Sequence, residues 1–483
     1  RLYSEVIYTP LLLLALLALI VALKSGDWKH FALAGALLAV TNLTRPTAIL
    51  LPLLLPILLP FAWSIKHRLL MCLVYGGAMV AVIAPWSYHN YRTYDTFLPL
   101  SVSTALLWQG SPEFYHLMEQ KRTLVQIWDT ELNPDVNGGH NAFTIEGDRY
   151  FTERAIASIK TEPDIYIWYS IKKLAYFWIG HPVNDWPHYS FFSFTAMQPY
   201  FFAPRIAAIY FTRLLPFVAL VGLFFVRRRW RDFIPLLLIC GYFMGIHAIA
   251  YTEIRYSEPL HPILAIFIAA TLGEVVTRFK HARAPSALSD TDSDTSTTKK
   301  VASPQLGVSI KNETNYVNFD RYFGWLMIGI IIVLGILFRC TNLDRKFYWH
   351  DEAYTSLRIS GYTEAEVIEQ IFTGQALDVA DIQQFQYPTS DKKISDTIVS
   401  LALEDPHHSP LYYIMAKIWV KYAGASVTAL RALSVLISLL VLPAIYWIAM
   451  ELFQSRITAW IAVCLASLSP FNIIYAQEAR EYS

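Results

Sequence analysis

The sequence predicts an all-α polytopic membrane protein. Of its 483 residues, 55% are hydrophobic and only 16% are charged, and the mean hydropathy is +0.36, unlike the composition of a soluble domain. Apolar runs of membrane length recur along the chain. The net charge of +1 and the short basic runs give no reason to expect a nucleic-acid partner. The four cysteines are scattered and indicate neither a disulfide framework nor a CxxC metal site.

Apolar stretches mark the predicted spans, and basic flanks orient them. The flanks 66–68, 227–231 and 278–283 belong on the cytoplasmic side by the positive-inside rule. Counting crossings from them places two large loops, 87–205 and 340–409, on the outside. Several spans are short for a full crossing, so we expect tilts and breaks. The predicted spans are 10–23, 31–43, 46–63, 69–86, 206–226, 233–250, 260–276, 323–339, 431–452 and 457–474.

A polar segment divides the chain into two membrane modules, 1–283 and 322–483. Residues 284–321 include a run of Ser, Thr and Asp without apolar periodicity. Such a composition cannot bury a core, so we expect a disordered cytoplasmic linker. The chain begins with arginine, and we expect no signal peptide. We also expect it to be a fragment, or the joined pieces of two longer proteins.

The second module carries three polar clusters that we expect on its outer face. The first, Trp349-His350-Asp351-Glu352, follows the predicted span 323–339. Two adjacent carboxylates are costly so close to hydrocarbon, although an ordinary solvated loop is the alternative. The second is His407-His408-Ser409-Pro410-Leu411, and the third is Gln477-Glu478-Ala479-Arg480-Glu481-Tyr482. Each alone is weak evidence, because a His-Pro turn is often a helix cap and Glu-Ala-Arg is ordinary helix surface. Their order and spacing together are more specific.

The position of the third cluster depends on segment 410–424. This apolar stretch is short for a crossing and contains Lys417 and Lys421. If it lies at the membrane interface, Gln477 emerges on the same face as Asp351. If it spans the membrane, Gln477 lies in the cytoplasm. We favour the interfacial placement.

The three clusters resemble motifs of the GT-C fold glycosyltransferases. Residues 324–483 are similar to the N-terminal half of dolichyl-phosphate-mannose–protein mannosyltransferases and bacterial aminoarabinose transferases. Asp351 and Glu352 match an acidic pair in the first external loop of that family. His408 to Leu411 match a His-Pro-Pro-Leu-like entry, with Ser in place of the first Pro, and Gln477 to Tyr482 match a Gln-Glu-Ala-Arg-x-Tyr segment. The resemblance implies a GT-C type multi-span helical bundle with large external loops.

The first module resembles the C-terminal half of the same family. The matching segments are Thr44-Arg45-Pro46-Thr47, Ala84 to Arg92 with His89 where the family often has Arg, Leu98-Pro99-Leu100-Ser101, and Tyr256 to Leu260 with Arg255 just before it. The order of the halves, C-terminal then N-terminal, departs from any single family member. It predicts two tandem enzymes fused and truncated at both ends, or a chain assembled from separate pieces.

The resemblance implies that a sugar passes from a polyprenyl-phosphate donor to an acceptor on the outer face, with inversion. In that reaction Asp351 is the general base that deprotonates the acceptor hydroxyl. Glu352 positions the acceptor or binds a cation. The lipid phosphate leaves with developing negative charge and calls for cationic groups. The candidates are Arg480 in the second module, and Arg92 and Arg255 in the first.

Further candidates on the active face are His407, His408, Gln477, Glu478 and Tyr482. A divalent cation is a possible cofactor, and its candidate ligands are Asp351, His408 and Glu478. Relatives do not all use a metal. The acceptor is expected to be a protein, a lipid or a polysaccharide, and the sequence does not identify the sugar.

Several of these residues also have plain structural interpretations. Arg45 is then a membrane-interface anchor, Arg92 caps an external helix, and Arg255 pairs with Glu258. External tryptophans are better candidates for sugar stacking than those at span ends, but the sequence does not choose among them. These external residues are Trp108, Trp128, Trp168, Trp178 and Trp186.

A competing functional class is a transporter or flippase of lipid-linked sugars. That class predicts inverted repeats and charges near the membrane midplane. Here the charges gather in large loops on one side and no internal repeat is found, which favours the enzyme. A third interpretation is a catalytically incomplete protein, because neither module contains both halves of one enzyme. We expect a bacterial inner (plasma) membrane location with the active face outward.

Overall fold

The described part of the protein is all-α. The computed structural model describes residues 5–97, 99–100, 105–120, 124–142, 144–180, 202–225, 227–283, 311–346, 348, 350–389, 391–404, 408, 410–477 and 479. Among these residues there is no β-strand. Five helical stretches are long and apolar enough to cross a membrane: Ile7–Ser25, Ile65–Tyr94, Trp230–Ile249, Ile254–Val276 and Val427–Phe453. The prediction of an all-α membrane protein is therefore confirmed.

The helices before residue 284 include one stretch that proline breaks into short pieces. They are α1 (Glu5–Ser25), α2 (Trp28–Asn42), η1 (Pro46–Ala48), η2 (Leu51–Leu54), α3 (Leu55–Leu58), α4 (Ile65–Tyr94), α5 (Leu106–Gln109), α6 (Pro112–Glu119), α7 (Leu124–Ile127), η3 (Trp128–Leu132), α8 (Ile145–Thr161), α9 (Pro163–Ile179), α10 (Phe202–Phe225), η5 (Arg227–Phe233), α11 (Ile234–Ile249), η6 (Ile254–Leu260) and α12 (His261–Arg283). Pro46, Pro52 and Pro56 lie in the predicted span 46–63. Each lacks a backbone N–H, so this span is a broken succession of turns instead of one helix.

The helices after residue 310 form the rest of the bundle and most of the second external segment. They are α13 (Lys311–Cys340), α14 (His350–Ser360), α15 (Glu364–Ile371), α16 (Val379–Gln383), η7 (Gln384–Gln386), α17 (Ile394–Glu404), α18 (Leu411–Ala423), α19 (Val427–Leu439), α20 (Val441–Phe453), α21 (Arg456–Ser467) and α22 (Pro470–Ala476). The sequence predicted a linker through residue 321, whereas α13 begins at Lys311. A helix satisfies its own backbone hydrogen bonds, so it extends past its apolar part. Residues 284–310 lie outside the described part.

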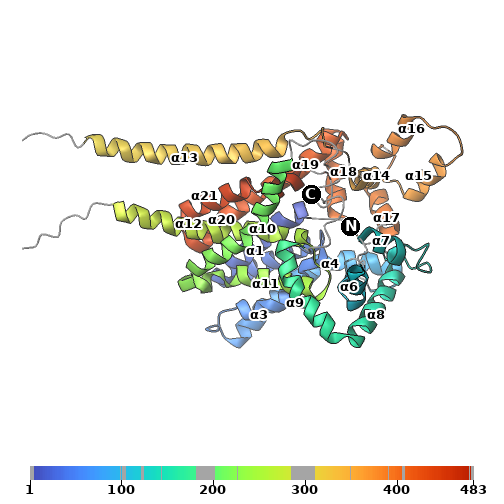
Figure 1. The fold of residues 1–483 in the computed structure, drawn as a ribbon, viewed down its shortest axis with the longest axis horizontal. Helices are drawn as coiled ribbons and strands as arrows, with labels where there is room; N and C mark the ends of the chain where they lie inside the picture. The colour runs from blue at the N-terminus through green and yellow to red at the C-terminus, as the bar shows by residue number, and fades with distance from the viewer. Residues whose placement is uncertain are drawn as a thin grey trace, which may run out of the picture.

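The long helices lie side by side along the long axis of the molecule (Figure 1). Helices α6 to α8 and α14 to α17, from the two segments that the sequence predicts to be external, gather at one end of the bundle, which we call the external end. The ends of α12 and α13 that flank residues 284–310 lie at the other end. The two segments predicted to be external therefore share one end, opposite the flanks of the predicted cytoplasmic linker.

Helices from before and after residues 284–310 share one apolar core. Helix α12 packs on α21, and α1 packs on α19 and α20. The rings of Phe233 and Phe453 lie 5.2 Å apart, and Lys24 Nζ lies 3.0 Å from Glu451 Oε2. The two predicted modules are thus packed as one bundle, although the sequence predicts two separate modules.

A glycine allows the closest helix approach in this core. A Cβ added to Gly35 of α2 would lie 2.1 Å from the carbonyl oxygen of Tyr75 on α4. That is far inside van der Waals contact, so only glycine allows the backbones to approach this closely.

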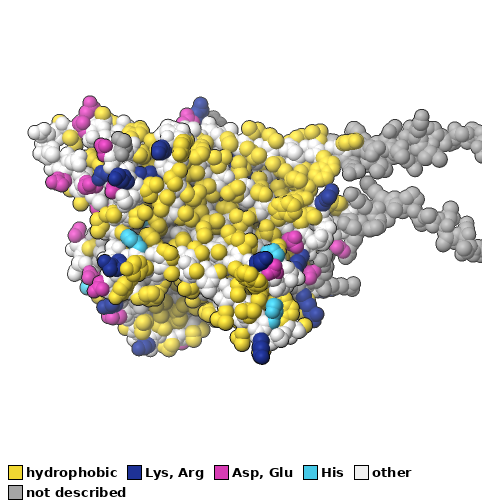
Figure 2. Space-filling view, turned by 180° about the vertical axis from the view of Figure 1, so that it is seen from behind, with side chains coloured by type: hydrophobic (Ala, Val, Ile, Leu, Met, Phe, Trp, Pro, Cys, Tyr) yellow, Lys and Arg dark blue, Asp and Glu magenta, His cyan; other side chains and the backbone are white. Residues whose placement is uncertain are grey.

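The face of the bundle seen in Figure 2 is broadly hydrophobic. On α4, Leu69, Leu73 and Val80 are 59%, 71% and 66% exposed, and their spacing places them on one helix face. An apolar face of this extent would be unfavourable in water, which supports contact with lipid.

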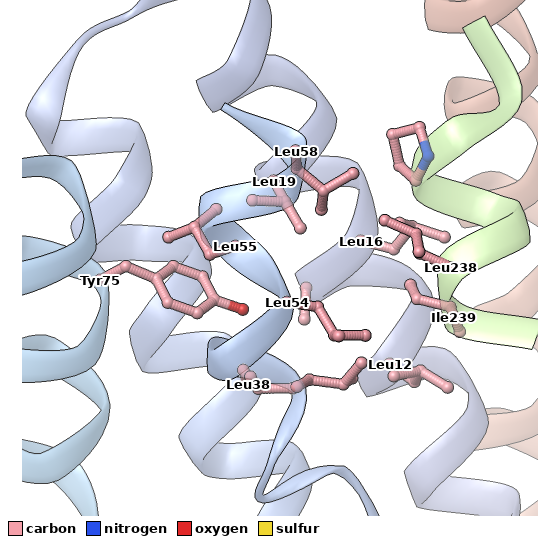
Figure 3. A pocket seen from close by; sticks show the side chains of 13 residues that line it. Leu12, Leu16, Leu19, Leu38, Leu54, Leu55, Leu58, Tyr75, Leu238 and Ile239 are labelled. Carbon is pink, nitrogen blue, oxygen red and sulfur yellow. The ribbon is translucent and has the colours of Figure 1, made fainter. Parts of the chain in front are cut away.

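A small apolar cavity lies between α1, the broken stretch and α11 (Figure 3). Leucines from α1, η2 and α3 converge on it together with Tyr75. Its volume is about 30 Å³, similar to that of one water molecule. A space of that size does not hold a polyprenyl chain.

Candidate functional site

The first polar cluster begins helix α14, which starts at His350 directly beyond the membrane helix α13. Asp351 is the second residue of α14, and the placement of its side chain lies outside the described part. Glu352 follows, and its side chain is 1% exposed. The acidic pair therefore stands on a short helix at the external end of the bundle (Figure 1).

Glu352 forms a buried bidentate ion pair with Arg431 of α19. Arg431 Nε donates to Glu352 Oε1 at 2.9 Å and Nη2 donates to Oε2 at 2.7 Å. Arg431 has no exposed surface. Fork-to-fork geometry of this kind is the strongest ion-pair arrangement in proteins. It joins α14 to the external end of the span Val427–Phe453.

The same guanidinium also fastens the loop that leaves α13. Arg431 Nη1 donates to the carbonyl oxygens of Leu343 and Lys346. Tyr348 from that loop donates its hydroxyl to the carbonyl oxygen of Glu352 at 2.9 Å. Burial raises the pKa of Tyr348 to about 12, so the hydroxyl remains a donor at neutral pH. Arg431 thus fixes both the start of α14 and the loop before it.

The third polar cluster reaches the same ion pair. The backbone N–H of Ala479 donates to Glu352 Oε1 at 2.7 Å. Gln477 donates its side-chain amide to the carbonyl oxygens of Phe338 and Thr341, and so caps the C-terminal turn of α13. Gln477 and Ala479 therefore lie at the end of the bundle where α14 begins. This is the arrangement that the interfacial placement of segment 410–424 predicted.

The second polar cluster lies beside a separate apolar cluster, which also includes residues of α14 and α22. The ring of His408 lies 5.9 Å from that of Tyr413, the third residue of α18. Tyr413 belongs to a buried cluster with Ile359 of α14, Tyr475 of α22 and Ala479. All three polar clusters thus border one packed unit, although they are far apart in the sequence.

Several predicted site residues lie outside the described part: His407, Glu478, Arg480, Tyr482 and the side chain of Asp351. The proposed metal set of Asp351, His408 and Glu478 therefore stays a prediction. Among the residues that are described, no group of three or more His, Cys, Asp or Glu side chains could hold a metal ion.

A cationic cluster forms around Tyr256 in η6. The guanidinium carbons of Arg45 and Arg255 lie 4.9 and 5.2 Å from the centre of the Tyr256 ring. His247 of α11 stacks on the same ring at 4.4 Å. Arg255 is 4% exposed and forms an ion pair with Glu253. Its pairing with Glu258, the structural interpretation of the sequence, stays a prediction. Two guanidinium groups therefore lie at one aromatic ring, and one of them is ion-paired with a carboxylate.

Arg92 does not belong to this cluster. It is exposed in the last turn of α4. A cation there interacts favourably with the helix dipole, as the structural interpretation of Arg92 expects.

The first turns of α1 lie between the acidic and the cationic sites. Ile7 belongs to the apolar cluster beneath α14 and α18. Its neighbour Tyr8 contacts Phe243 of α11, with ring centres 6.2 Å apart, one turn before His247. Helix α1 also packs on η6, α19 and α22.

Comparison of the chain with protein-family models, curated proteins and solved structures found no match. Its function is therefore inferred from its own residues and their geometry.

Sequence reasoning missed Arg431, Arg339 and Lys173. Arg339 in the last turn of α13 is buried and donates to the carbonyl oxygens of Ser467 and Gly335 at 2.6 and 2.8 Å. Lys173 of α9 is fully buried and donates to carbonyl oxygens of Gly110 and Ala250 at 3.1 and 2.9 Å. For Arg431 and Arg339 the available signal was a lone cation in an apolar stretch, which needs a buried partner. Lys173 lies beside Lys172 and gave no such signal.

Proposed function

We propose that the protein is an integral-membrane glycosyltransferase. It moves a sugar from a polyprenyl-phosphate donor to an acceptor hydroxyl on the outer face, with inversion at the anomeric carbon. Asp351 is the general base in this proposal. The acceptor belongs to a protein, a lipid or a polysaccharide, and the membrane is the bacterial inner membrane.

One observation supports the proposal: Glu352 of the acidic cluster is bonded both to Arg431 and to Ala479 of the Gln-Glu-Ala-Arg segment. The carboxylate of Glu352 accepts two bonds from Arg431 and one from the Ala479 N–H. Three hydrogen bonds inside the protein hold this carboxylate in one position. Glu352 is therefore a positioning residue, and its neighbour Asp351 is left as the carboxylate for chemistry.

The proposed step needs a base and a site for phosphate. The carboxylate of Asp351 takes the proton of the acceptor hydroxyl while that oxygen attacks the anomeric carbon. The bond between that carbon and the phosphate oxygen breaks, and the electron pair leaves with polyprenyl phosphate. The developing phosphate charge calls for guanidinium groups, and we assign this role to Arg45 and Arg255 beside the Tyr256 ring. The phosphate would compete with Glu253 for Arg255.

The test compares Asp351→Asn with the wild-type chain in lipid nanodiscs. Polyprenyl phosphates carrying mannose, glucose or aminoarabinose are offered with a membrane extract as the source of acceptors. Mass spectrometry then measures released polyprenyl phosphate and glycosylated acceptor. Removing a general base lowers the rate by about 10²–10⁴-fold, while donor binding is retained.

A matched control is Glu369→Gln. Glu369 is an exposed carboxylate on α15 in the same external segment, and this substitution also removes one negative charge. It should leave the rate unchanged. Near-normal turnover by Asp351→Asn would refute the assignment of the base, and no transfer from any donor would refute the transferase proposal.

A further inference from the structure

We propose that the first external segment binds a saccharide in a hollow at Trp128. The hollow has a volume of about 330 Å³, at the lower end of the range of about 300–1,000 Å³ typical of small-molecule sites. Its lining residues are Trp128, Asp129, Leu132, Asn133, Pro134 and Asn141.

The backbone that forms one wall is unusual. Residues Trp128–Leu132 form a π-helical turn, η3, directly after α7. Such turns are rare and occur frequently at functional sites, because the wider turn re-aims its side chains. Trp128, Asp129 and Leu132 of this turn all line the hollow.

The opposite wall is a loop that side-chain bonds hold in place. Asn137 donates to the carbonyl oxygens of Glu131 and His140 at 3.0 and 2.7 Å, and it accepts from the His140 N–H at 2.9 Å. The Gly139 N–H donates to the carbonyl oxygen of Pro134 at 2.8 Å. The hollow is therefore preorganised and would lose little conformational entropy on binding a ligand.

An ion-pair network anchors this unit to the rest of the external segment. Arg154 of α8 donates to Glu131 at 2.9 Å and to Glu113 of α6 at 2.7 Å. Glu113 in turn accepts from the indole N–H of Trp108 at 3.0 Å. The π-turn is thus tied to α6 and α8 behind it.

The chemistry of the lining fits a sugar. The C–H face of a pyranose packs on an indole ring, and its hydroxyls need acceptors and donors in the same plane. Asp129 supplies carboxylate acceptors, and Asn133 and Asn141 supply both amide donors and acceptors. A purely apolar ligand would not need these groups, and a nucleic-acid backbone would be repelled by Asp129.

The structure separates Trp128 from the other external tryptophans. Trp108 has no exposed surface and packs in the core. Trp168 is 55% exposed on α9 and does not line the hollow. Trp178 packs on Phe177 with ring centres 5.0 Å apart. Trp186 lies outside the described part.

The hollow lies at the external end of the bundle, where α7 and α14 are both found (Figure 1). Saccharide binding here goes beyond the proposed transfer reaction and does not require it. A sugar site at this end would hold a glycan at the membrane surface, whichever chemistry follows.

The test measures saccharide binding by the full chain in nanodiscs. Saturation-transfer difference NMR is recorded with methyl α-mannopyranoside, methyl β-glucopyranoside, N-acetylglucosamine and cellobiose as probes. We expect binding of at least one probe, with the strongest saturation on ring C–H protons. Trp128→Ala should weaken it at least tenfold. Asp129→Asn, which keeps the shape of the side chain, should weaken it several-fold.

The matched control is Trp168→Ala, which removes an exposed tryptophan elsewhere in the same segment and should leave binding unchanged. Circular dichroism and the thermal midpoint of each variant check that it is folded. Equal binding by Trp128→Ala would overturn the proposal. So would the absence of binding by every probe at a concentration about 20-fold above a weak Kd of about 1 mM. Because no donor is present, this result is independent of the transfer assay.

Discussion

Replacing Arg431 by Met should cost about 3–5 kcal/mol of unfolding free energy. The guanidinium has no exposed surface and donates to both oxygens of Glu352 and to two carbonyl oxygens. Arg431→Met leaves the buried carboxylate of Glu352 without its bidentate partner. Breaking a buried pair from one side typically costs this much, because the remaining charge is uncompensated. Equilibrium unfolding of the full chain in mixed micelles measures the loss.

The double variant Glu352→Gln, Arg431→Met provides the decisive comparison. It should cost less than the sum of the single losses, because the second substitution removes a charge that the first left unpaired. Arg345→Met is the matched control, since Arg345 is exposed in the same loop and should change stability by less than about 0.5 kcal/mol. A loss below about 1 kcal/mol for Arg431→Met, or additive losses in the double variant, would refute this account of the site.

Two further predictions concern packing and pH. Gly35→Ala should destabilise the bundle by about 1–3 kcal/mol in thermal unfolding, because its Cβ would lie 2.1 Å from a backbone oxygen on α4. The control Gly76→Ala, whose Cβ would have nothing within 4 Å, should be neutral or slightly stabilising. Burial lowers the pKa of Lys173 to about 7. Between pH 7 and about 10.5 the unfolded chain then binds more protons than the folded chain. The free energy of unfolding should therefore rise with pH across that window and be flat just below it. Unfolding midpoints from pH 6 to 10 should lose this rise in Lys173→Met and keep it in the half-buried Lys172→Met, and an unchanged slope in Lys173→Met would contradict the assignment.

The apolar periodicity was sufficient to locate the membrane helices but not their ends. The span predicted at 69–86 is part of α4, which runs from Ile65 to Tyr94 with Pro85 inside it. Polar and aromatic residues continue the helix beyond the bilayer, where hydropathy no longer reports on structure. The external segment 340–409 was predicted as a loop and contains α14 to α17. Helices this short are marginal alone and are stabilised by tertiary packing, which a local pattern does not record.

The candidate site was predictable in its residue types and not in its partners. The carboxylates of Asp351 and Glu352 stood out because of their position after a span. Nothing local distinguished their roles, which depend on Arg431, 79 residues after Glu352. Arg431 was the first residue of a predicted span, where a cation usually serves as an interface anchor. Its bidentate contact with Glu352 is a consequence of folding and has no sequence signature.

The two modules follow each other in the order C-terminal half, then N-terminal half. Their packing bears on whether a single chain of this kind can hold all the groups that the proposed reaction needs. Neither module contains both the acidic cluster and the cationic cluster, which is why the sequence left an incomplete protein as an alternative. In the structure the two clusters flank the first turns of α1, with Ile7 packed beneath α14 and Tyr8 against α11. The shared core between α12 and α21 holds them there through helix packing rather than chain order. Under the proposed function, the groups assigned to the donor phosphate and to the acceptor therefore belong to one packed chain.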